Sequence, residues 1–113
     1  MQVKVQEKIR RDPKLASVVD GATKVLEGEV TSSADRATAE WSLSQDEQNR
    51  PLVELRLSDF EGSVARRFSL DELTNTSYLQ GRLNRLWDDL LAVRLDKQLA
   101  RLRQSVQKLE EED

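Results

Sequence analysis

The sequence predicts an α+β fold, in which a three-stranded antiparallel meander is covered on one face by an N-terminal helix and a long C-terminal helix. Three observations predict it. Apolar residues recur at helical spacing before residue 28, alternate with polar residues over 37–69, and return to helical spacing up to residue 111. A chain of 113 residues has room for one core, so we expect a single domain over 1–113.

The first helix is expected over residues 13–27. Asp12 is a favoured N-cap, and Pro13 suits the first helical turn, where its missing N–H costs nothing. Gly28 stands where a C-terminal cap is expected, and the small and polar residues 28–36 predict a linker. The apolar face of this helix contains Leu15, Val18, Val19, Ala22, Val25 and Leu26.

Residues 2–11 are compatible with two structures. Val3 and Val5 alternate with polar residues, as in an edge strand. The Gln, Glu, Lys and Arg residues around them favour a frayed helix instead. The sequence leaves both alternatives open.

The meander is expected over residues 37–69. Two runs of alternating residues are separated by a polar stretch that ends at Pro51, and a loop at 59–62 leads into a third run. One face is therefore apolar and covered, and the other is polar and wet. The predicted apolar face contains Ala39, Trp41, Leu43, Val53, Leu55, Leu57, Val64 and Phe68.

Arg66 breaks the pattern, because strict alternation places it on the apolar face between Val64 and Phe68. A β-bulge, or an edge position from which the guanidinium reaches water, explains it without a function. The functional alternative is a contact with an anion or with a carboxylate of a partner. Arg66 is therefore a candidate site residue.

The C-terminal helix is the longest predicted element. Ser69-Leu70-Asp71-Glu72 matches the capping box, and a long helix is expected to restart near residue 76 or 77 and to cover 76–111. Its apolar residues, at steps of three and four, read as one continuous stripe: Leu79, Leu83, Leu86, Trp87, Leu90, Leu91, Leu95, Leu99, Leu102, Val106 and Leu109.

This helix is too long for the sheet, since it measures about 52 Å and the strands about 27 Å. Leaving Leu99, Leu102, Val106 and Leu109 in water would forfeit about 6–12 kcal/mol. Either the N-terminal segments wrap the helix, or the helix self-associates, which we favour. The predicted interface contains Trp87, Leu91, Leu95, Leu99, Leu102 and Val106, although Trp87 also suits a place in the core.

Composition excludes several classes of site. The chain contains no Cys and no His, so disulfides, thiol nucleophiles, imidazole ligands and histidine-dependent triads are absent. Asp88, Asp89 and Asp96 are explained as solvated charge rather than as a cation site, because adjacent helical residues point about 100° apart. We expect no catalytic residue, no cofactor and no metal.

Charge and hydropathy limit the partners. The net charge is −3 and no segment is strongly basic. The basic and Gln-rich residues 94–108 suit a normal polar helix face, so we expect no binding to nucleic acids. No apolar run exceeds four residues, so we expect no membrane span, and the N-terminus lacks an apolar signal core, so we expect a cytoplasmic protein.

The sequence therefore favours a non-enzymatic protein-interaction or assembly module, acting as a homodimer or as an adaptor for a protein partner. Two alternatives remain. One is a nucleic-acid-associated small dimeric protein, and the other is a carboxylate-dependent enzyme.

Overall fold

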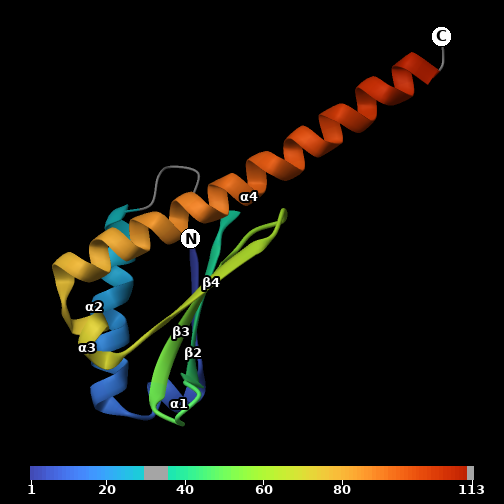
Figure 1. The fold of residues 1–113 in the computed structure, drawn as a ribbon. Coiled ribbons are helices and arrows are strands. Elements are labelled where there is room, and N and C mark those ends of the chain that lie inside the picture. Colours follow the sequence, from blue (N-terminus) through green and yellow to red (C-terminus); the bar gives the residue numbers. More distant parts are fainter. Residues whose placement is uncertain (30–35, 112–113) are drawn as a thin grey trace.

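The structure is a computed structural model, and it describes residues 1–29 and 36–111, with side chains as far as Leu109. Figure 1 shows a sheet flanked by helices and a last helix that continues well beyond it, as the α+β prediction requires. The molecule measures 63 × 31 × 24 Å. Its elements are β1 (Gln2–Val5), α1 (Glu7–Arg10), α2 (Pro13–Glu29), β2 (Thr38–Gln45), β3 (Pro51–Ser58), β4 (Ser63–Phe68), α3 (Leu70–Thr74) and α4 (Thr76–Glu111).

The sheet has four strands in the order β1-β2-β3-β4. The predicted meander is present, because β2, β3 and β4 pair antiparallel in sequence order. The prediction of three strands is incomplete, since β1 pairs parallel with β2 and places Gln2 opposite Thr38. Parallel neighbours need a long crossover. Helices α1 and α2 lie in the segment that connects β1 to β2. The sheet is mixed, because it contains one parallel pair and two antiparallel pairs.

Residues 2–11 contain both of the structures that the sequence left open. Val3 and Val5 lie in β1, and Ile9 lies in the single turn of α1, where it is fully buried. Gln6 joins the two elements to β2: its N–H donates to the carbonyl of Trp41 over 2.9 Å, and its Oε1 accepts from the N–H of Leu43 over 2.8 Å. The Gln6 side chain therefore takes the place of a backbone acceptor for β2, one position beyond the end of β1.

Helix α2 begins as predicted and ends later. Asp12 Oδ1 accepts from the N–H groups of Lys14 and Leu15 at 3.0 and 3.2 Å, which confirms the N-cap. The expected cap at Gly28 is wrong, because the helix continues to Glu29. The Glu29 carboxylate accepts hydrogen bonds from two amides of α4, Gln80 at 2.7 Å and Asn84 at 3.0 Å. Of the predicted linker 28–36, residues 30–35 lie outside the described residues.

The two faces of the meander differ as the alternation predicts. On the polar face, which is open to water, the Glu54 carboxylate lies between two guanidinium groups. Its oxygens are 3.8 Å from Nη2 of Arg56 and 3.6 Å from Nε of Arg67, and such ion pairs near the surface contribute little stability. On the covered face, Leu43 and Val64 are half-buried at its margins. The fully buried members are Ala39, Trp41, Val53, Leu55, Leu57 and Phe68.

The capping box at Ser69 is confirmed. The Ser69 hydroxyl accepts from the N–H of Glu72 over 3.2 Å, and the Glu72 carboxylate accepts from the N–H of Ser69 over 2.9 Å. Asn75 then caps α4, because its Oδ1 accepts from the N–H of Tyr78 over 3.3 Å. Helix α4 therefore restarts at Thr76, within the predicted range. Its first half completes the core with Leu79, Leu83, Leu86, Trp87 and Leu90.

The capping box predicts an acid-dependent loss of stability. The N–H of Ser69, then the Tyr78 hydroxyl, and to a smaller extent the charge of Arg66 lower the pKa of Glu72 below its ordinary value of 4.5, against a weaker opposing effect of burial. A carboxyl group with a lowered folded-state pKa stabilises the fold above the unfolded pKa and loses that contribution as the pH falls through the folded pKa.

We therefore expect Glu72→Gln to reduce the free energy of unfolding by about 0.5 kcal/mol at pH 7, because the amide retains the cap but not its charge. This difference from the wild type should shrink as the pH falls below 4.5. Urea unfolding at several pH values measures it. A difference that stays constant or grows in acid would contradict the role of the charge.

Candidate functional site: the projecting half of helix α4

The core covers only the first half of α4. Leu90 is fully buried and Leu91 is half-buried, but from Leu95 to Leu109 every residue is exposed. Five large apolar side chains in this projecting half follow one another at steps of four, three, four and three residues, and we call them the distal stripe. They are Leu95 (56% exposed), Leu99 (42%), Leu102 (61%), Val106 (47%) and Leu109 (65%).

The distal stripe does not continue the buried face of α4. Successive residues of a helix turn by about 100°. Summed along α4, this rotation places the mean direction of the distal stripe about 140° from that of the buried residues between Leu79 and Leu90. The apolar pattern that reads as one stripe therefore has two parts, which face nearly opposite sides of the helix.

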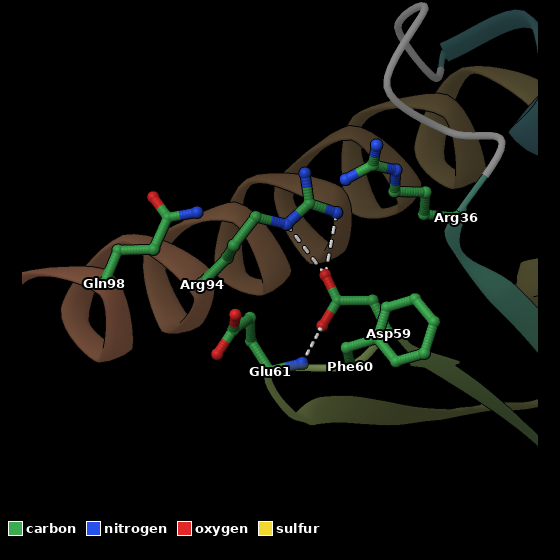
Figure 2. Close-up of a pocket in the computed structure, with 6 residues that line it drawn as sticks. All are labelled: Arg36, Asp59, Phe60, Glu61, Arg94 and Gln98. Atoms are coloured by element: carbon green, nitrogen blue, oxygen red, sulfur yellow. Dashed lines mark hydrogen bonds and ion pairs between the residues drawn. The ribbon is translucent and has the colours of Figure 1, made fainter. Parts of the chain in front are cut away.

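The Asp59 carboxylate attaches the β3–β4 hairpin to α4 (Figure 2), on the side of the helix that faces the sheet and the core, which together we call the body. Asp59 Oδ1 accepts from the N–H groups of Glu61 and Gly62 at 2.8 and 3.2 Å, and so shapes the turn. Asp59 Oδ2 lies 2.8 Å from Nε and 2.7 Å from Nη2 of Arg94. The Asp59 side chain is 3% exposed and that of Arg94 is 20% exposed, so this ion pair is shielded from water.

Two further contacts fix the hairpin against α4. Glu61 forms an ion pair with Arg101. Gly62 lies so close to the helix that an added Cβ would stand 2.8 Å from Cγ1 of Val93. Val93, Arg94 and Arg101 all lie on the side of α4 that faces the body. The hairpin therefore leaves the distal stripe uncovered.

A polar hollow lies at this joint. It is lined by Arg36, Phe60 and Gln98 together with the hairpin carboxylates and Arg94 (Figure 2). Both carboxylates are already paired with arginines of α4. Phe60 is 91% exposed at the tip of the hairpin. The arrangement is that of a structural joint between two elements.

The six residues of the predicted interface lie in three different environments in the structure. Trp87 is 2% exposed and belongs to the core, which is the alternative the sequence also offered. Leu91 lies at the boundary, and the remaining four belong to the distal stripe. The wrapping alternative is not seen within the described residues, because α2 meets α4 near Gln80 and Asn84, far from the projecting half.

Arg66 occupies an edge position without a bulge. The register from the Val53–Phe68 pair to the Ser58–Ser63 pair is unbroken, and it places Arg66 opposite Leu55 on the covered side of β4. Its side chain is half-buried, and its guanidinium lies 6.0 Å from the centre of the Phe68 ring. The structure therefore places Arg66 at an edge position and shows no β-bulge there.

The acidic residues of α4 do not converge. Within residues 1–29 and 36–109, no three acidic side chains are placed to hold a metal ion together, and Asp88, Asp89 and Asp96 are exposed. In the same part of the chain, no helix combines the length and the apolar character that a membrane crossing needs. Comparison of the chain with protein-family models, curated proteins and solved structures finds no match.

Sequence reasoning missed the joint at Asp59. The sequence predicts only a loop at 59–62 that connects two strands. Only the structure shows that the second oxygen of this carboxylate binds the helix. An arginine 35 positions away gives no local signal in the sequence.

Gly62 provides a test of this joint. We expect Gly62→Ala to reduce the free energy of unfolding by about 1–2 kcal/mol, because the new methyl group overlaps Val93, whose branched side chain is stiff. The backbone itself accepts alanine, since no glycine has a positive φ. The double variant with Val93→Ala should lose less than the two single changes together. Denaturant unfolding measures all of these variants.

Gly81 is the matched control for this experiment. An added Cβ there meets nothing within 4 Å, so Gly81→Ala in the helix should stabilise the chain by about 0.5–1 kcal/mol. Equal effects at the two glycines would contradict the close approach of the hairpin to α4.

Arg66 provides a second test. We expect Arg66→Leu to change the free energy of unfolding by less than about 1 kcal/mol, because the guanidinium lies at an edge and in no ion pair within the described residues. Arg67→Leu, on the wet face of the same strand, is the control. A loss of several kcal/mol at Arg66 alone would reveal a buried partner for its charge.

Proposed function

We propose that this chain is a non-enzymatic, single-domain protein-interaction module of the cytoplasm, and that it forms a homodimer through the distal stripe of α4. One observation carries the proposal: five large apolar side chains lie in a row on a helix that projects into water. Contiguous exposed apolar surface of this kind marks interaction sites in soluble proteins.

A second helix fits this surface. Steps of four and three residues repeat every seven positions, which is the spacing of a coiled-coil seam. The stripe is also self-complementary, because a two-fold axis brings the same patch of each chain together. We therefore favour a second copy of the chain over an unrelated partner as the occupant.

The energy of burial suits a reversible dimer. Complete burial of an aliphatic side chain gives about 1.5–3 kcal/mol, and the distal side chains are already about half covered by their own helix, so two stripes contribute roughly 10 kcal/mol. Association itself costs about 4–15 kcal/mol. The net gain is then at most about 6 kcal/mol, so we expect a dissociation constant of tens of micromolar or weaker.

Light scattering tests the proposal. The wild-type chain of 13.0 kDa should show about twice that mass at high micromolar concentration and approach the monomer mass on dilution. Leu102→Asp should give a folded monomer, because residue 102 is 61% exposed in the single chain and the new charge is buried only in the dimer.

Gln104→Asp is the matched control, since it adds the same charge to the projecting half on the side away from the distal stripe. It should dimerise like the wild type. A wild-type chain that stays monomeric at several hundred micromolar would refute self-association. The distal stripe would then remain a site for a different helix.

A further inference from the structure

Charged residues flank the distal stripe, and the inference drawn from them rests on the proposed function. In heptad notation, Leu99 and Val106 occupy a positions, and Leu95, Leu102 and Leu109 occupy d positions. The flanking e positions are Asp96 and Arg103. The flanking g positions nearest the middle, Gln98 and Ser105, carry no charge.

Asp96 and Arg103 lack an ion-pair partner at helical spacing on α4. The residues three and four positions away from each of them, where helical ion pairs form, are uncharged. Within the described part of the chain, neither side chain takes part in an ion pair. They differ in this respect from Arg94 and Arg101, which bind the hairpin.

We propose that the second copy binds antiparallel, in the register that places Leu99 against Leu102 of the second copy. The same register places Leu95 against Val106 of the second copy. In an antiparallel coiled coil, e positions face e positions. Asp96 of each chain then lies beside Arg103 of the other, so the two-fold axis creates two identical ion pairs.

Other registers lack this complementarity. If the second helix is shifted by one heptad in one direction, Asp96 faces Asp96 of the second copy. If it is shifted in the other direction, Arg103 faces Arg103 of the second copy. Both shifts therefore bring like charges together. A parallel pair places the e positions beside Leu91 and Gln98, which offer no charge.

The antiparallel register gives the dimer a specific shape. The helices overlap from Ala92 to Leu109, about 27 Å. Because each distal stripe faces away from its own body, the two bodies lie at opposite ends and on opposite sides of the helix pair. Two chains of 63 Å then form a particle about 100 Å long. Such a dimer is a spacer that presents two identical bodies far apart.

Introduced cysteines test the orientation directly, since the natural chain contains none. We expect Leu95→Cys and Val106→Cys to form a disulfide-linked dimer when mixed under mild oxidation, and neither to do so efficiently alone. Both positions are about half exposed in the single chain, so the changes leave the core intact. Gel electrophoresis without reductant and small-angle scattering provide the readouts.

The outcomes separate orientation from self-association. Rapid crosslinking of each variant with itself, with no gain on mixing, would overturn the antiparallel register while leaving the dimer in place. Crosslinking in neither case, together with a monomer mass in light scattering, would refute the dimer itself.

Charge reversal tests the register independently. We expect Asp96→Arg and Arg103→Asp each to weaken the dimer roughly tenfold, and the double variant to recover most of the wild-type dissociation constant. Gln104→Arg, on the side away from the distal stripe, is the control and should change nothing. A double variant that is no better than the single changes would show that residues 96 and 103 do not meet across the interface.

Discussion

The pairing of Asp59 with Arg94 is the interaction on which the outer half of the molecule depends. The carboxylate shapes the β3–β4 turn with one oxygen and binds α4 with the other. Glu61 and Gly62 add contacts on the same side of the helix. Because the hairpin occupies this side, it fixes which face of α4 is turned toward the body. The opposite face is thereby left to water.

The sequence predicts the local features of this fold well. The cap at Asp12 and the capping box at Ser69 are each decided within three or four residues, so nothing distant overrides them. The alternation of apolar and polar residues in β2 and β3 is also a local pattern, and it correctly predicts a sheet with one covered face. Strand β1 was only one of two alternatives for residues 2–11, because its four residues join the sheet through a parallel partner 36 positions away, which no local pattern reveals.

The candidate site could be predicted only in part. Spacing identified the apolar residues of α4, but steps of three and four residues do not by themselves show that the apolar face changes direction along the helix. Between Leu90 and Leu95 this face turns away from the core, and Trp87 and Leu102 consequently lie in different environments. The deciding contact, from Asp59 to Arg94, joins two residues that share no sequence pattern.

The projecting half of α4 is suited to reversible association, because it needs no partner in order to be helical. The costly step of helix formation, the first turn, is completed where α4 packs on the core. Beyond Leu95 the helix is extended by Leu, Lys, Gln, Arg and Ala, which have high helix propensity. Val106 is the only β-branched residue between Leu95 and Leu109. A second chain therefore meets a preformed surface, and binding carries little of the ordering cost that a disordered segment would add.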